Sequence, residues 1–205
     1  MDHVRQVADP RLELLHQLFS AATHDASAAM SRWTSGLISL SLDEVRELPL
    51  AEASGELNMS DDLLTMVVLS LEGDIGGEMI LTFDDENARQ LAATLLNREP
   101  DQSSEWSELE QSALNETGNI LGCAYMNALT RLIGVELVPS PPYFIQDFGA
   151  SVLQQALMVQ AIETDTVLVC RTRFDRDGEE LNWNVFFIPS AALQSRMENA
   201  LQTTI

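Results

Sequence analysis

The sequence of 205 residues contains no lysine, and all eleven of its basic residues are arginine. Thirty-two acidic residues outnumber them, so the formal net charge is −21 at pH 7. Binding to nucleic acids and to anionic membrane surfaces depends on clustered Lys and Arg, so we expect neither kind of partner. Solubility or adaptation to salt is the simplest reason for such an acidic composition.

Cysteine and long apolar runs are also scarce. Only Cys123 and Cys170 occur, both in apolar segments, which is typical of buried thiols in a reducing cytoplasm. No apolar run approaches the roughly 18 residues of a membrane span. The first residues have no basic region followed by an apolar stretch, so we expect no secretion signal and a cytoplasmic protein. The histidines do not combine with Cys or acidic residues into a metal-ligand spacing, so we expect no metal site.

The chain divides into two halves that begin in the same way. Residues 12–33 are rich in apolar residues and contain no Pro or Gly, which predicts a long helix. A second long helix is predicted over 108–133, because Gly134 then falls at the position where Gly favours helix termination. Ser107, followed three residues later by Glu110, predicts a capping box at the start of this second helix.

Each predicted long helix is followed by predicted strands and a shorter helix. In the first half the predicted strands are 37–42, 64–71 and 78–83, and the predicted short helix is 85–97. In the second half the predicted strands are 135–138, 166–174 and 181–188, and the predicted short helix is 190–201. We therefore expect an α+β fold in which residues 1–205 form a single domain of two repeats, about 10–97 and about 105–203. Joined edge to edge about a pseudo-twofold axis, the halves would form one sheet of about six strands, with the two long helices packed across it.

The second long helix carries polar residues on an otherwise apolar sequence. It contains no charged residue from Thr117 to Thr130. Ser112, Glu116 and Asn119 are spaced i, i+4, i+7, so they share one face. On spacing alone, a partly exposed stripe of ordinary polar residues accounts for this pattern as well as a functional site does.

Small residues follow on the same helix. Gly118 and Gly122 form a small-xxx-small pair, which predicts a close approach of the two long helices. Cys123 lies one turn after Asn119, and we expect it to be a small buried apolar residue rather than a reactive thiol.

The pattern of polar residues on the second long helix resembles the motif of the CheC/CheX family of phosphatases that act on phosphorylated CheY. The family motif is Asp or Ser, three residues, Glu, two residues, Asn, twenty-two residues and Pro. Ser112, Glu116, Asn119 and Pro142 match all four positions. The duplicated layout resembles that family over nearly the whole chain.

The resemblance implies a chemotaxis hydrolase that removes the aspartyl phosphate of a CheY-like response regulator. Asn119 would position the attacking water, and Glu116 would pair with a lysine of the receiver domain. Ser112 would be a secondary polar contact, and Pro142 would shape the loop after the first strand of its half. The protein would need no cofactor of its own, because Mg²⁺ is expected in the receiver partner.

Two other functions fit parts of the sequence. A CheC-like binding or adaptor protein would regulate a CheD-like deamidase or act at the flagellar switch, without catalysis. An unrelated enzyme for a small molecule would need a closed pocket with convergent polar groups. Because duplication supplies internally what a dimer of single halves would, we expect a monomer.

The first half departs from the family motif. Aligning the ends of the two long helices places Gln17 opposite Glu116 and Ser20 opposite Asn119, and neighbouring registers do not restore Glu-x-x-Asn either. The Pro position falls among residues 42–44, where the sequence is Leu-Asp-Glu. We therefore expect one working site, in the second half.

Overall fold

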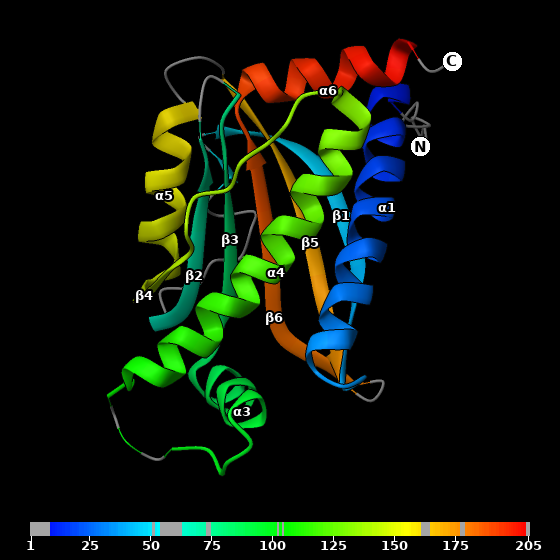
Figure 1. Cartoon of the computed structure of the whole chain (residues 1–205). Coiled ribbons are helices and arrows are strands. Elements are labelled where there is room, and N and C mark those ends of the chain that lie inside the picture. The colour runs from blue at the N-terminus through cyan, green and yellow to red at the C-terminus, as the bar shows by residue number, and fades with distance from the viewer. Residues whose placement is uncertain are drawn as a thin grey trace, which may run out of the picture.

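The computed structural model describes residues 9–50, 52–53, 63–72, 75–101, 103, 105–160, 165–176 and 179–203. In chain order its elements are α1 (Pro10–Trp33), β1 (Ile38–Pro49), β2 (Leu63–Leu71), β3 (Gly77–Phe83), α3 (Asp85–Leu95), α4 (Glu108–Ile133), β4 (Tyr143–Phe148), α5 (Gly149–Gln160), β5 (Thr166–Arg176), β6 (Glu179–Pro189) and α6 (Ala191–Thr203). The strands form one six-stranded antiparallel sheet, with α1 and α4 packed across it (Figure 1). The predicted α+β class and the arrangement of the two long helices are confirmed.

The two halves share the sheet by exchanging their first strands. The strand order is β1-β5-β6-β3-β2-β4. Strand β1 of the first half therefore pairs with β5 of the second, and β4 of the second half pairs with β2 of the first. Strands β3 and β6 pair at the centre of the sheet. The halves interlock rather than meeting along a single edge, so neither half completes its part of the sheet alone.

Local signals define both long helices. The side chain of Asp9 accepts a hydrogen bond from the Arg11 N–H at the start of α1. At the start of α4, Ser107 and Glu110 form the predicted capping box, which satisfies backbone N–H groups that a helix leaves without intrahelical partners. Gly134 ends α4 in the left-handed conformation, with φ 68°.

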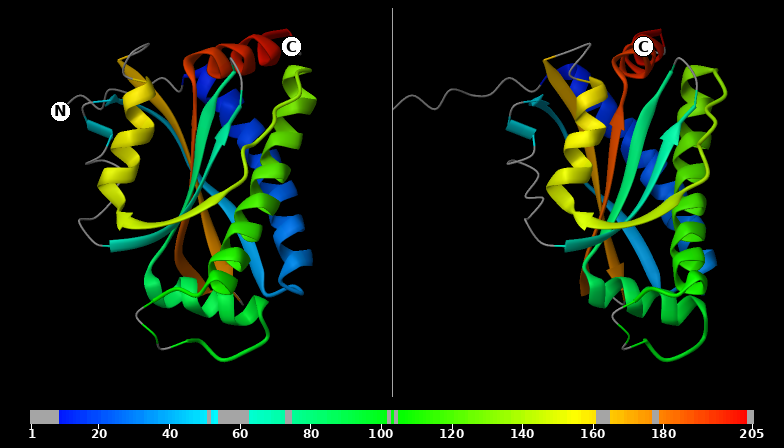
Figure 2. Two further views of the ribbon diagram at one scale, coloured as in Figure 1. Left: turned by 60° about the vertical axis from the view of Figure 1, so that its left-hand side comes forward. Right: turned by 90° about the vertical axis from the view of Figure 1, so that its left-hand side faces the viewer.

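The sheet separates two hydrophobic cores. One core lies under α1 and α4, with α3 and α6 at opposite ends of this layer, and the other lies under α5 on the reverse face (Figure 2). A buried hydroxyl network joins the elements of the first core. The Tyr125 hydroxyl of α4 lies 2.8 Å from the Thr23 Oγ1 of α1 and 2.6 Å from the Thr172 Oγ1 of β5. This network ties the two long helices to each other and to the sheet.

One predicted strand of the second half is wrong, and the predicted place of Pro142 is wrong with it. Residues 135–138 form no strand, and only Pro139 makes an isolated bridge, to Leu71. The first strand of this half begins at Tyr143, because prolines in the intervening segment lack the N–H that a β-ladder requires. Pro142 thus lies just before that strand rather than after it.

Two further elements extend beyond the sequence-based expectation. Helix α5 was not predicted, since a short apolar run between a strand and a loop has no distinct periodicity. Strand β1 continues to Pro49 because its pairing with β5 resumes after a register shift between Leu42 and Glu44. Within the described residues, no helix is both long and apolar enough to cross a membrane.

Candidate functional site

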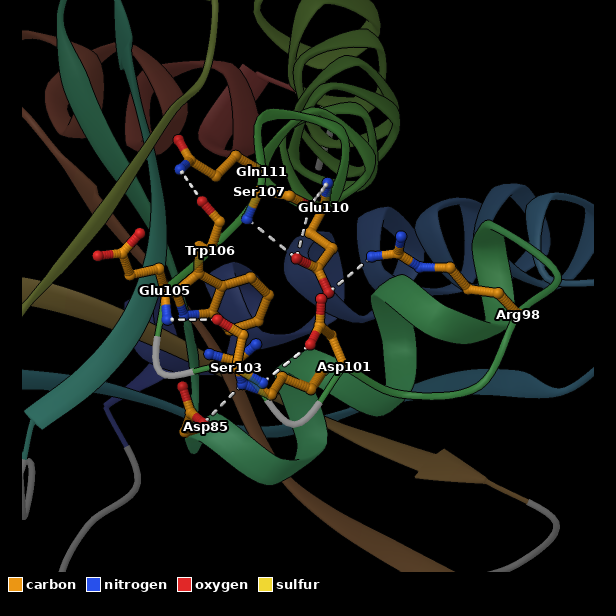
Figure 3. A network of polar contacts seen from close by, with 10 residues as sticks. Asp85, Arg98, Asp101, Ser103, Glu105, Trp106, Ser107, Glu110 and Gln111 are labelled. Atoms are coloured by element: carbon orange, nitrogen blue, oxygen red, sulfur yellow. Dashed lines mark hydrogen bonds and ion pairs between the residues drawn. The ribbon is translucent and has the colours of Figure 1, made fainter.

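The start of α4 is held by a buried carboxylate. Glu110 is 1% exposed. Its carboxylate accepts hydrogen bonds from the N–H of Ser107 (3.0 Å) and from the Ser107 hydroxyl (2.6 Å), and it pairs with Arg98 (2.8 Å; Figure 3). Burial raises the pKa of the Glu110 carboxyl, but the bonds from Ser107 and the charge of Arg98 outweigh it, so the net pKa is lowered. The first turn of α4 is therefore fixed by an ionised group.

An aromatic cluster joins this end of α4 to its neighbours. The Arg89 guanidinium of α3 lies 4.3 Å from the ring centroid of Trp106, a cation–π geometry. The ring centroids of Trp106 and Phe144 are 5.3 Å apart, which connects the segment just before α4 to strand β4. Helix α3, the start of α4 and strand β4 thus support one another close to the predicted site residues.

The glycines of α4 bring the helix close to the sheet. A Cβ atom added at Gly118 would lie 2.6 Å from the Val67 Cγ1, and one added at Gly122 would lie 2.8 Å from the Leu69 Cδ2. Both neighbours belong to β2, so the small-xxx-small pair permits helix-to-sheet contact and not the predicted helix-to-helix contact. The added Cβ at Gly118 would also lie 3.5 Å from the Pro142 Cβ, so this glycine sets the distance between α4 and the proline loop.

The four predicted motif residues lie around one groove. Ser112, Glu116 and Asn119 project from α4 with exposed side chains, and the facing wall is the loop from Pro139 to Pro142. The groove has a volume of about 390 Å³. It is open and shallow, so it does not match the closed pocket that a small-molecule enzyme would need.

The proline loop is fastened to the sheet. The Ser140 N–H donates to the Ser70 carbonyl oxygen (2.7 Å), and the Ser70 N–H donates to the Ser140 Oγ (3.0 Å). Just before this loop, the Glu72 N–H donates to the Val138 carbonyl oxygen (3.0 Å). The prolines also restrict their own backbone angles, so the wall that faces Glu116 is rigid.

The structure corrects the expectation for Cys123 and adds one groove residue, Asn115, that the sequence motif does not include. Cys123 is exposed, not buried, and its Sγ lies 3.7 Å from the Asn119 Oδ1, within reach of a weak thiol hydrogen bond. Asn115 also lines the groove, although the family motif leaves it out. The signal for Asn115 was present in the sequence, since it lies four residues before Asn119 and so faces the same side of the helix.

The corresponding face of α1 is built differently. His16, Gln17, Ser20 and His24 are exposed along a shallow hollow of about 530 Å³ whose lining residues all belong to α1. Strand β1 begins at Ile38, shortly after α1 ends, so within the part of the chain that the structure describes no loop lines this face of α1 as the proline loop faces α4. The positions that align with Pro142 lie inside β1.

Neither face resembles a metal site. Among the described residues, no group of three or more His, Cys, Asp or Glu side chains is arranged to hold a metal ion. Of the residues that the structure describes, Glu116 is the one carboxylate that lines the groove, beside two carboxamides and two serine hydroxyls. This arrangement can orient water and pair with a cation, but it lacks the ligands of a metal centre.

No family model matches the sequence. A curated relative does: the CheY-P phosphatase CheC of Bacillus subtilis is 24% identical over 187 residues, which cover 89% of this chain and 90% of that protein. Among solved structures, FliY of Thermotoga maritima superposes with a TM-score of 0.74 at 17% identity, covering 98% of this chain and 100% of FliY. The chain is thus similar in sequence to a CheC protein and similar in fold to FliY.

Other solved structures of related proteins share the fold. The CheX–CheY–BeF3–Mg²⁺ complex from Borrelia burgdorferi provides a match with a TM-score of 0.58 at 18% identity, covering 84% of this chain and 97% of that one. In this chain the second half carries all four motif residues around its groove, whereas the first half has Gln17 and Ser20 in the aligned positions.

Proposed function

We propose that this protein hydrolyses the aspartyl phosphate of a CheY-like receiver domain that docks against α4. The observation that carries the proposal is the groove itself. Glu116 and Asn119 are exposed one turn apart on a helix fixed at both ends, opposite a rigid wall that includes Pro142. The similarity to a protein named as a CheY-P phosphatase supports the same activity.

Asn119 is proposed to orient the nucleophile. Hydrolysis of an aspartyl phosphate requires a water oxygen to attack phosphorus in line, while the bond from phosphorus to the aspartate oxygen breaks and inorganic phosphate leaves. A carboxamide offers both an acceptor and two donors, and it does not titrate near neutral pH. Asn119 can therefore hold this water in the attacking position. It would lower the barrier by reducing the entropic cost of orienting the water, and not by accepting a proton.

Glu116 is proposed to set the docking register. Its exposed carboxylate can form a charge-assisted hydrogen bond with the receiver's phosphate-site lysine. That contact would bring the phosphoryl group beside Asn119, one turn further along α4, with Ser112 as an additional polar contact. The site lies on an open helix flank, which suits a macromolecular substrate because a receiver domain can approach it.

Mg²⁺ is proposed to arrive with the receiver. The solved CheX–CheY complex from Borrelia burgdorferi contains BeF3 and Mg²⁺. In phosphoryl transfer the metal balances the charge on the phosphoryl oxygens, while the phosphatase residues supply orientation. This division of tasks agrees with a groove that offers one carboxylate.

The direct test is to mix the protein with phosphorylated CheY-like receivers in Mg²⁺ and to follow the release of phosphate. We expect catalytic amounts of the protein to shorten the lifetime of one phosphorylated receiver, and the Asn119→Ala variant to lose this effect. Receivers that bind the protein but keep their unassisted lifetime would instead favour the adaptor function. In that case a change in the activity of a CheD-like deamidase would be the next measurement.

A further inference from the structure

The groove contains a buried polar atom that the proposed mechanism does not use. Asn115 lies next to Glu116 in the sequence, and its side chain lines the same groove. Its Oδ1 is buried and has no hydrogen-bond partner within the described part of the chain. By contrast, the side chains of Ser112, Glu116 and Asn119 are exposed. The orphan acceptor therefore lies deeper in the groove than the motif residues.

The position of Asn115 on the helix explains this depth. Asn115 lies three residues before Gly118, so both face the same side of α4. Gly118 is the residue that packs against Val67 and Pro142. Asn115 is thus placed toward the inner side of the groove, between α4 and the proline loop, whereas Glu116 is rotated outward toward its rim.

An unsatisfied buried carbonyl oxygen costs free energy in the unbound protein. The cost is recovered when a group that enters the groove donates a hydrogen bond to it. Glu116 supplies a full charge for a cationic side chain, so the neutral carboxamide beside it is suited to a neutral N–H, from a backbone amide or a side-chain carboxamide.

We propose that Asn115 is a docking contact whose Oδ1 accepts a hydrogen bond from a neutral N–H of the receiver. The inference rests on the proposed function, because it assigns the same groove to the same partner. It adds a fourth α4 residue to recognition, at the floor of the groove. This contact secures the bound receiver and takes no part in the chemical step, so it acts on KM and not on kcat.

The matched variants are Asn115→Leu and Asn127→Leu. Leucine has the same branched shape and the same number of side-chain heavy atoms as asparagine, but it is bulkier and has no acceptor. Asn127 is an exposed asparagine on the same helix that lines the separate hollow between α1 and α4. Asn127→Leu therefore measures the change in helix propensity without touching the groove. Asn115→Ala is the second groove variant, which removes the acceptor without adding bulk at the site.

We expect both Asn115 variants to raise KM for the phosphorylated receiver about three- to tenfold, while kcat stays within about twofold of wild type. Titration with the receiver in Mg²⁺ and beryllofluoride should show the same loss of affinity. Asn115→Leu should also raise the melting temperature more than Asn127→Leu, because it removes an unsatisfied buried group. A role that is only structural would lower the melting temperature and leave the affinity unchanged.

Three results would overturn the inference. The first is an unchanged KM and affinity in both Asn115 variants while wild-type protein remains active, which leaves the proposed function intact. The second is a lower melting temperature for Asn115→Leu than for Asn127→Leu, which would show that Oδ1 is already satisfied in the free protein. The third is wild-type protein that neither binds nor dephosphorylates any receiver, which overturns the proposed function together with this inference.

Discussion

Helices α1 and α4 occupy equivalent places in the two halves, yet among the described residues only α4 has a second wall beside its exposed polar face. Both are long, both cross the same face of the sheet, and both present an exposed polar face. The loop from Pro139 to Pro142 faces α4, whereas the chain after α1 turns almost directly into β1. The difference indicates that a groove beside the helix forms where the segment that follows the helix is long enough to fold back against it.

The two helices also differ in how closely they approach the sheet. Alignment of the helix ends places Phe19 opposite Gly118 and Thr23 opposite Gly122. Phe19 is buried in the core with its ring tilted against that of Phe187, the ring centroids 5.6 Å apart. At this position α1 therefore fills the space between helix and sheet with a large side chain. Helix α4 has a glycine there, so its backbone lies closer to the sheet. The close approach of α4 to the sheet is accompanied by the contact of Gly118 with Pro142 at the proline loop.

The largest expected effect tests whether the α4 face is catalytic. Asn119→Ala should lower kcat for receiver dephosphorylation about 100-fold or more, because the attacking water loses its orientation. Asn127→Ala is the matched control on the same helix and should keep wild-type kcat. Circular dichroism should show unchanged folding in both. A kcat for Asn119→Ala within about twofold of wild type would remove Asn119 from the mechanism.

The charge on the α4 face is tested by Glu116→Gln, an isosteric change at the position where α1 has Gln17. We expect KM for the phosphorylated receiver to rise about tenfold, because the charge-assisted bond to the receiver lysine is lost. Added salt should raise the KM of wild type more than that of the variant. An unchanged KM with a lost kcat would instead place Glu116 in the chemical step.

The close approach of α4 is tested by Gly118→Ala and Gly122→Ala. A methyl group at Gly118 meets the stiff β-branched Val67, whereas one at Gly122 meets the movable end of Leu69. Overpacking should outweigh the gain in helix propensity only at Gly118, for a net loss of about 1 kcal/mol in the free energy of unfolding. Urea denaturation measures this, and equal stabilities of the two variants would contradict the packing argument.

The smallest expected effect concerns the α1 face. Ser20→Ala should change kcat by less than about twofold, because the Ser20 hydroxyl is too short to replace a carboxamide and Gln17 cannot form the charged pair. The double variant Ser20→Ala with Asn119→Ala should match Asn119→Ala alone. Phosphate release is the measurement, and a clearly less active double variant, with both proteins folded, would show that the first half is catalytic.

Much of the local structure was predictable from the sequence. The bounds of α4 follow from its capping box and from Gly134, which act within a few residues of the helix ends. The strand pairs β2–β3 and β5–β6 follow from apolar runs of strand length. The relation between Glu116 and Asn119 follows from helical periodicity alone. These features depend on short-range geometry, so a single sequence contains the information for them.

The remaining features depend on segments that are distant in the sequence. The exchange of β1 and β4 between halves follows from pairing energies across the whole sheet. Local strand propensity does not specify which strands pair. The exposure of Cys123 and the contact of Gly118 with Val67 depend on how α4 is rotated against β2. The sequence by itself determined most of the elements and the motif. Only the tertiary structure decided that the proline loop faces the motif, because the hydrogen bonds between Ser140 and Ser70 that hold this loop in place span 70 residues.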